Sequence, residues 1–184
     1  MLYIIRHGKT DWNNERRLQG RTDIPLNEEG RKMAEEARER YGDVHFDICF
    51  SSPLKRARET AEILLKDRNI PIMTDDRLLE MYFGEYEGLA YSFQNSDCPI
   101  NVLFRDPASY KESVGGAETF EELFARTGEF YEEKVKPLLA ENKDVLIVGH
   151  GAMNSAMICV IKHLPVSKFW DAGIENCKLL KVEV

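Results

Sequence analysis

Two histidines stand directly after short apolar runs, at positions where buried strands are expected to end. His7 follows the run Leu2–Ile5, with Arg6 before it, and His150 follows the run Val145–Val148. Each histidine is followed by a glycine, which lets the backbone approach a ligand closely. Ligands in open α/β sheets gather at the carboxyl ends of strands, so both imidazoles are expected at one edge. If the strands are neighbours, the rings can face one another, and a neutral imidazole there is a competent nucleophile.

Two arginines can join the histidines at this edge. Arg6 is adjacent to His7, and Arg56 lies one turn into a predicted helix that follows the apolar run Phe46–Phe50. A planar guanidinium fork suits a tetrahedral phosphate far better than a neutral substrate. Helix N-termini at the same edge are expected to add backbone N–H donors. Because the chain has a net charge of −7, the pattern predicts a local basic pocket for a phosphate group on an acidic protein.

Each of these residues also has an ordinary explanation. An arginine at a strand end is often a surface charge, and a single histidine is more often packed or solvated than catalytic. The repeated combination of apolar strand, histidine and glycine is hard to obtain by chance. A metal-dependent hydrolase with His7 and His150 as ligands is a further alternative, but the flanking arginines would repel a cation. The sequence offers no carboxylate cluster for a metal, so we expect no metal and no cofactor.

The elements that must position these side chains alternate between strands and helices. Apolar runs predict strands at Leu2–Ile5, Phe46–Phe50, Ile70–Met73, Val145–Val148 and Lys178–Val184. Helical periodicity and caps predict helices at Glu28–Arg40, Leu54–Leu65, Glu118–Leu139 and Ala152–Ile161. Asn27 is expected to cap the first helix, and Pro53 to occupy the first turn of the second. The alternation indicates an α/β layered fold, and without repeats or linkers one domain over residues 1–184 is the simplest interpretation.

Two segments have no sustained period. Residues 9–25 are polar and are predicted to form a loop. Residues from about Asp75 to Gly116 are irregular, and an excursion of this length is usually functional, so residues 81–116 are predicted to be an inserted lid or specificity region. Its aromatic residues Phe93, Phe104 and Tyr110 either contact an apolar leaving group or anchor the lid to the domain.

Composition excludes several other classes of protein. The chain is acidic, with a pI near 5.2, which argues against general nucleic-acid binding. No apolar stretch reaches membrane-spanning length. Its four cysteines form no C-x-x-C pair and no zinc-type spacing with histidine. The cytoplasm is the expected location, and neither nucleic acid nor a membrane is expected as a partner.

The segment from Arg6 to Asn13 resembles the R-H-G-[EKQ]-T-x-W-N signature of the histidine phosphatase superfamily, the phosphoglycerate mutase-like proteins. The resemblance covers most of the chain in the right order. It continues through residues 18–20, 23–30, 51–57, 60–61, 79–80, 83–84, 87–88 and 148–151. It implies a three-layer α/β/α fold with a mostly parallel central sheet.

The resemblance also implies roles for individual residues. His7 would be the nucleophile, with Arg6, Arg56 and His150 binding the phosphoryl oxygens. The family's proton donor is matched by Glu80, although Glu85 and Glu87 lie nearby, and Glu87 fits a structural Glu-Gly turn better. Asn13 would be a neutral donor to the substrate. The remaining substrate-binding positions implied are Gln19, Gly20 and Gly151.

The implied activity is metal-independent hydrolysis of a phosphomonoester through a phosphohistidine. Nearby arginines are expected to lower the pKa of His7 and keep it neutral. A short chain and a compact region after Glu80 favour a phosphatase, with Gln19-Gly20 typical of that branch; a cofactor-dependent phosphoglycerate mutase is the alternative. A non-catalytic phosphate-binding module is a third interpretation, which the occupied catalytic positions argue against. Candidate substrates are sugar phosphates, phosphoglycerates and ribazole-phosphate-like esters, and the protein is expected to be a monomer or homodimer.

Overall fold

A five-stranded sheet forms the centre of the computed structural model, which describes residues 1–90 and 97–184. The strand order is β3-β2-β4-β1-β5. The strands are β1 (Leu2–Arg6), β2 (Ile48–Ser51), β3 (Ile72–Thr74), β4 (Val145–Gly149) and β5 (Leu179–Val182). The first four strands pair in parallel and only β5 runs antiparallel, against β1. The expected mostly parallel sheet is therefore confirmed.

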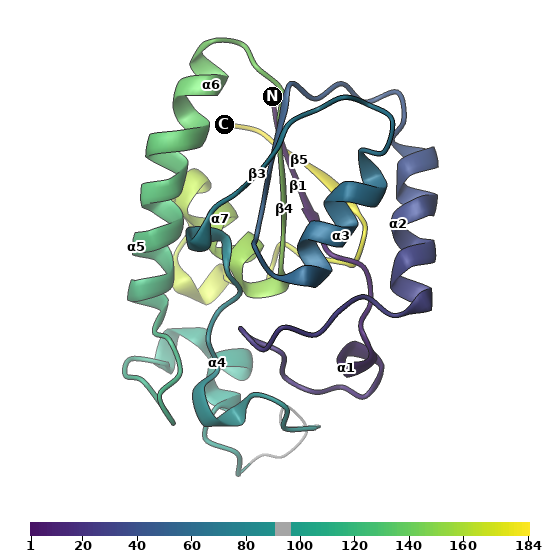
Figure 1. Ribbon diagram of the computed structural model, residues 1–184. Helices are drawn as coiled ribbons and strands as arrows, with labels where there is room; N and C mark the ends of the chain where they lie inside the picture. The colour runs from purple at the N-terminus through teal and green to yellow at the C-terminus, as the bar shows by residue number, and fades with distance from the viewer. Residues whose placement is uncertain (91–96) are drawn as a thin grey trace.

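Helices cover both faces of this sheet (Figure 1), which confirms the three-layer arrangement. One side carries α2 (Glu28–Arg40) and α3 (Lys55–Leu64). The other side carries α5 (Phe120–Phe130), α6 (Lys136–Ala140) and α7 (Gly151–Lys162). None of the helices among the described residues is both long and apolar enough to cross a membrane.

The central strands are buried on both faces, which explains why their sequences are continuously apolar. Side chains alternate along a strand, so Ile4 and Ile147 pack toward the α5 and α7 side, with Phe130. Ile5 and Val148 pack toward α2 and α3 instead. The core around the sheet is therefore two apolar layers separated by the strands. A third apolar cluster, which includes Met81, Leu103 and Phe120, packs beyond them.

Strand pairing brings the two predicted histidine segments together. In β1 and β4, Ile5 is paired with Val148 and Arg6 with Gly149. The amide of His7 then donates to the carbonyl of Gly149 at 3.0 Å. Because the strands are parallel neighbours in this register, both histidines follow the carboxyl ends of their strands at the same end of the sheet.

Several local expectations needed correction. The segment 9–25 is not entirely loop, because α1 (Asp11–Asn14) lies within it, with a reciprocal capping box between Thr10 and Asn13. Pro53 precedes α3 rather than entering its first turn, since Leu54 is the N-cap. The helix expected from Glu118 begins at Phe120 after the N-cap Thr119. It continues from α5 through a π-helical turn, Tyr131–Val135, into α6.

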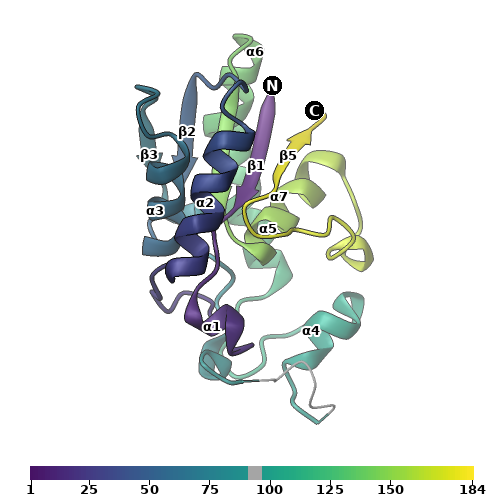
Figure 2. The same cartoon turned by 90° about the vertical axis from the view of Figure 1, so that its right-hand side faces the viewer.

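The irregular stretch after Asp75 is built from short helical turns. In residues 75–90 and 97–116 these are the 3₁₀ turns Asp76–Leu78, Gly84–Tyr86 and Pro107–Ser109 and the helix α4 (Asn101–Arg105). In both views α1 and α4 lie at the end of the sheet toward which β1 runs (Figures 1 and 2). The role of residues 81–116 as a lid stays a prediction.

The three aromatic residues of this region have different places. Tyr110 is buried, donates its hydroxyl to the carbonyl of Glu118 at 3.1 Å and packs edge-on against Phe120. It therefore anchors the region, as the second interpretation held. Phe104 is only partly buried and lines the candidate site, whereas Phe93 lies outside the described residues.

Candidate active site

The hydrogen bonds of His7 define which of its ring nitrogens carries the lone pair. Nδ1 lies 2.6 Å from the carbonyl oxygen of Gly8, and a carbonyl can only accept. Nε2 lies 3.2 Å from Nε of Arg56, and a guanidinium can only donate. The proton therefore sits on Nδ1, and Nε2 presents its lone pair on the side of Arg56.

The second histidine lies against the first. The ring centroids of His7 and His150 are 5.1 Å apart, with the planes tilted by 60°. His150 is fully buried, and neither of its ring nitrogens has a hydrogen-bond partner. An unpartnered buried polar group is costly, so the His150 ring is suited to contact a ligand that completes the site.

Two guanidinium groups complete the basic cluster. Arg56 is fully buried on α3 and donates to the carbonyls of Gly20, at 2.7 Å, and Thr22, at 2.9 Å, as well as to His7. Burial lowers its pKa to about 10, so Arg56 remains a cation at neutral pH. Arg6 donates through Nη1 to the carbonyl of Ile174 at 3.2 Å, while its buried Nε has no partner.

Both histidines are held in the neutral form. Burial is the largest cause, and the nearby cations Arg56 and Arg6 add to it, so the pKa of His7 lies well below the usual 6.5. The same causes, with His7 as a further one, lower the pKa of His150. The expected lowering of the His7 pKa is therefore confirmed, with burial contributing more than the arginines.

Glu80 sits on the N-terminus of the helix that follows His150. Its Oε1 accepts from the amide of Met153 at 2.9 Å, and its Oε2 from the amide of Ala152 at 3.3 Å. On α3, the amide of Lys55 is likewise occupied, by Asp23 at 2.8 Å. The expectation that these helix N-termini donate directly to a phosphate is therefore wrong for these three amides, because side-chain oxygens of Glu80 and Asp23 already accept from them.

Eight of the nine predicted site residues line one hollow of about 230 Å³. They are Arg6, His7, Asn13, Gln19, Gly20, Arg56, Glu80 and Gly151. The ninth, His150, is not on the wall and lies against the His7 ring instead. The structure thus brings together residues that are widely separated between positions 6 and 151 of the chain.

The smaller polar contacts around the hollow explain several of these residues. The side-chain oxygen Oδ1 of Asn13 accepts from the backbone amide of Thr10 at 3.0 Å. The side-chain nitrogen Nδ2 of Asn13 is therefore the atom that can donate to a ligand. The hydroxyl of Thr10 also donates to Oε1 of Gln19 at 2.8 Å. Gly20 has φ of 57°, and a Cβ there would lie 1.9 Å from Oε1 of Glu87, so only glycine fits.

Glu87 is structural, as its Glu-Gly context indicates. Its carboxylate accepts from the amides of Arg21, at 2.8 Å, and Thr22, at 2.9 Å, and from the amide of Phe83 at 3.2 Å. The residue thereby ties the loop around Gly20 to the segment that follows Glu80.

One wall of the hollow is aromatic, and the sequence did not indicate its full composition. Phe83, Phe104 and Trp170 line it. Phe104 stacks on Trp170, with centroids 5.5 Å apart and planes 23° apart, and also contacts Phe83 at 5.9 Å. Trp170 lies 66 residues beyond Phe104 in the chain, and no local pattern points to this pairing.

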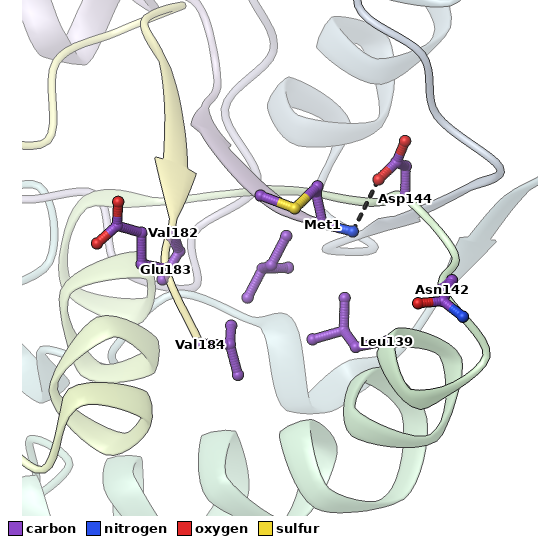
Figure 3. Close-up of a pocket in the computed structure, with 8 residues that line it drawn as sticks. Met1, Leu139, Asn142, Asp144, Val182, Glu183 and Val184 are labelled. Atoms are coloured by element: carbon purple, nitrogen blue, oxygen red, sulfur yellow. Dashed lines mark hydrogen bonds and ion pairs between the residues drawn. The ribbon is translucent and has the colours of Figure 1, made fainter.

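The described residues include one group that could ligate a metal, His45, Asp47 and Asp144, and it lies away from this hollow. Asp47 and Asp144 precede β2 and β4, at the opposite edge of the sheet from the histidines. Figure 3 shows the ion pair of 2.7 Å between Asp144 and the amino group of Met1, beside an apolar hollow at the chain ends. Asp47 lies 3.6 Å from the ammonium of Lys143, so both carboxylates already have cationic partners.

Fold and site together define a class of protein: α/β proteins with a buried basic site for a phosphate-like anion at the carboxyl ends of parallel strands. Comparison with known proteins identifies the family. Residues 2–184 match the model of the histidine phosphatase superfamily (branch 1). The chain therefore belongs to the histidine phosphatase superfamily.

Individual relatives agree with this assignment. The chain is 38% identical over 160 residues to the uncharacterized phosphatase PhoE of Bacillus subtilis, covering 86% of this chain and 75% of that protein. It is 30% identical over 180 residues to a 2,3-bisphosphoglycerate-dependent phosphoglycerate mutase 2 of Gloeobacter violaceus, covering 96% and 82%. The structure of a mycobacterial glucosyl-3-phosphoglycerate phosphatase in complex with VO3 superposes with a TM-score of 0.84 at 29% identity, covering 97% and 90%.

Further matches are named phosphoserine phosphatase and alpha-ribazole phosphatase. Phosphomonoester hydrolysis, in a family that needs no metal ion, is thus the activity class of this chain. The alternative activity is that of a phosphoglycerate mutase, as in the relative from Gloeobacter violaceus.

Proposed function

We propose that His7 takes the phosphoryl group of a small phosphomonoester onto its Nε2. One observation carries this assignment: Nδ1 is held at 2.6 Å from the carbonyl of Gly8, which leaves the lone pair on Nε2 beside Arg56. Only a neutral imidazole has this lone pair to give, and the pKa of His7 is lowered by burial and by Arg56 and Arg6. No separate base is needed, and the hydrogen bond from Arg56 to this lone pair opens when the N–P bond forms.

The phosphoryl oxygens are bound by Arg6, Arg56 and His150 in this proposal. Support comes from polar atoms that are buried without partners, Nε of Arg6 and both ring nitrogens of His150. Charge spreads over the equatorial oxygens in the transition state, and fixed cationic donors stabilise it there. Asn13 adds a neutral donor. These groups do the work that metal ions do in other phosphoryl-transfer enzymes.

Glu80 is the proposed acid and base. In the first step the bond between Nε2 of His7 and phosphorus forms, the ester P–O bond breaks, and the proton of Glu80 goes to the leaving alcohol oxygen. In the second step the Glu80 carboxylate takes a proton from water, the water oxygen bonds to phosphorus, and the N–P bond breaks. Inorganic phosphate leaves, and neutral His7 and protonated Glu80 are restored.

The aromatic wall favours hydrolysis of an ester with an apolar or ring-containing alcohol. Phe83, Phe104 and Trp170 would contact the leaving group with apolar surface. A mutase must also hold the second anionic group of a bisphosphoglycerate. Beyond Arg6 and Arg56, the lining among residues 1–90 and 97–184 contains one further cation, Arg17. Its charge is already paired with Glu15, and it also donates to the carbonyl of Gly88.

A hydrolysis panel tests the proposed function. Wild type, His7→Ala and the matched control His163→Ala, an exposed histidine at the end of α7, are assayed in EDTA with aryl and alkyl phosphates, phosphoserine and 3-phosphoglycerate. We expect hydrolysis by wild type and by the control, and a loss of at least ~10³-fold in His7→Ala. No hydrolysis by wild type, or activity only with added divalent ions, would overturn the proposal. Dominant phosphoglycerate interconversion would establish the mutase instead.

We further infer that the protein acts in a reducing compartment such as the cytoplasm. Its four cysteines, Cys49, Cys98, Cys159 and Cys177, are all buried free thiols, as is usual where thiols stay reduced. Monomer and homodimer are both compatible with this proposal, and sedimentation of the purified protein distinguishes them.

A further inference from the structure

Arg126 uses its entire guanidinium group inside the protein. Nε and Nη2 donate to the two carboxylate oxygens of Glu118, at 2.6 and 3.0 Å. Nη1 donates to the carbonyls of Arg77, at 2.6 Å, and Leu79, at 2.8 Å, and Nη2 also donates to the carbonyl of Glu80 at 3.2 Å. A guanidinium has five N–H donors, so none is left to bind a substrate.

The three carbonyls belong to the short segment that carries Glu80. Glu118 closes the other side of this segment, because its Oε2 accepts from the amide of Tyr82 at 3.2 Å and its amide donates to the carbonyl of Tyr82 at 2.8 Å. The main chain is therefore fixed immediately before and after the proposed acid. Only the side chain of Glu80, which accepts from Ala152 and Met153, reaches the site.

This ion pair is shielded from solvent. The side chain of Arg126 is 15% exposed and that of Glu118 is 7% exposed. A charged pair at this depth needs complete hydrogen bonding to offset its desolvation, and the carbonyls of the Glu80 segment provide it. Neither residue lines the hollow that contains His7.

We propose that Arg126 and Glu118 are positioning residues that hold Glu80 in place for proton transfer to the leaving group. The inference rests on the proposed function, since it requires Glu80 to be the acid. Proton transfer needs the acid within hydrogen-bond reach of the leaving oxygen, and a small displacement of the main chain costs about 10²-fold in rate. Loosening the Arg126 network would therefore slow the acid-dependent reaction selectively.

The test compares two leaving groups. An alkyl phosphate such as glycerol phosphate needs its leaving oxygen protonated, whereas p-nitrophenyl phosphate leaves as a stable phenolate and does not. The readout is the ratio of kcat/KM for the two substrates, measured on the same sample. This ratio does not change when part of the enzyme is unfolded, and kcat/KM reports phosphoenzyme formation only.

The variants are Arg126→Lys and Glu118→Gln, with Glu80→Gln as the benchmark. Lysine keeps the charge of Arg126 but lacks the fork that reaches Glu118 and three carbonyls at once. We expect Arg126→Lys and Glu118→Gln to lose ~30- to 100-fold with glycerol phosphate and less than ~3-fold with p-nitrophenyl phosphate. Glu80→Gln should show the same selectivity with a larger loss.

Arg77→Lys is the matched control. Arg77 joins the same segment to α5 and the π-helical turn through ion pairs with Glu129 and Glu133, at 3.4 and 2.7 Å. The hydrogen bonds and ion pairs of its side chain go to Asp75, Glu129 and Glu133 rather than to Glu80. The ratio of kcat/KM for glycerol phosphate and p-nitrophenyl phosphate in Arg77→Lys should equal that of wild type, even if the variant is less stable. Equal losses with both substrates in Arg126→Lys, beside a selective Glu80→Gln, would overturn the positioning role. No selectivity in Glu80→Gln would instead overturn the acid assignment of the proposed function.

Discussion

Nε of Arg56 donates a hydrogen bond to Nε2 of His7 across 3.2 Å, so a fully buried cation faces the lone pair of a fully buried imidazole. The pair links α3 to the end of β1, two elements that lie about fifty residues apart in the chain. Protonating His7 would place a second cation against Arg56 in a buried site, which is why the neutral form dominates.

The pH dependence follows from this pair. Burial, then Arg56 and Arg6, lower the pKa of His7 well below 6.5. We therefore expect the His7 ring to stay neutral in an NMR titration between pH 8 and about 6, with no loss of kcat/KM from its protonation in that range. A midpoint above pH 7 for the His7 resonance would contradict this account.

The same shift links stability to pH. For both His7 and His150 the pKa in the folded protein lies below the ordinary value of 6.5. The unfolded chain therefore binds more protons once the pH falls below about 6.5, so stability from these groups is present above that pH and lost as the pH falls. We expect the free energy of unfolding, measured with urea, to fall less steeply below pH ~6.5 in His150→Gln than in wild type. The same dependence on pH in both proteins would contradict the lowered pKa of His150.

Arg56 itself should be needed for activity through geometry as well as charge. Arg56→Lys removes the donors to the carbonyls of Gly20 and Thr22, and we expect a loss of ~10²- to 10³-fold in kcat/KM for p-nitrophenyl phosphate. Arg58→Lys is the control on the same helix, since Arg58 is exposed and forms an ion pair with Glu62, one turn further along α3. A comparable loss in both variants would contradict the assignment.

Trp170 should contribute to substrate preference rather than to the chemical step. Trp170→Ala removes the ring that stacks on Phe104. We expect KM for naphthyl phosphate to rise ~5- to 30-fold, from ~1–2 kcal/mol of lost aromatic contact, with little change for glycerol phosphate. Equal changes in KM for both substrates would show that the aromatic wall does not select the leaving group.

Two helical glycines should respond to alanine with opposite signs. In α2, a Cβ on Gly30 would lie 2.0 Å from the carbonyl oxygen of Lys9, so Gly30→Ala should destabilise by ~1–3 kcal/mol. In α5, a Cβ on Gly128 would meet Val160 at an ordinary 3.6 Å, so Gly128→Ala should stabilise by ~0.5–1 kcal/mol. Urea unfolding measures both. Stabilisation by Gly30→Ala would show that the approach of α2 to the His7 loop is not tight.

The sequence by itself determined the sheet and the main basic groups. Strands buried on both faces must be continuously apolar, so Leu2–Ile5 and Val145–Val148 were readable as buried strands of an α/β sheet. That the two strands are neighbours came only from the structure. A polar residue directly after such a run has its position dictated by the strand end, which is why His7 and His150 were placed correctly. The signature from Arg6 to Asn13 then identified the family.

Only the tertiary structure decided how the other groups meet. Three of these contacts join residues that are far apart in the chain. They are the stacking of Phe104 on Trp170, the hydrogen bonds from the five donors of Arg126, and those from the α7 amides to Glu80. No period of 2 or 3.6 residues spans such distances, and side-chain hydrogen bonds depend on the packing of whole elements. The helix amides that were expected to bind phosphate donate to Glu80 and Asp23 instead, for the same reason. The local sequence places a backbone donor at a helix N-terminus, but the packing of the whole fold determines which acceptor lies next to it.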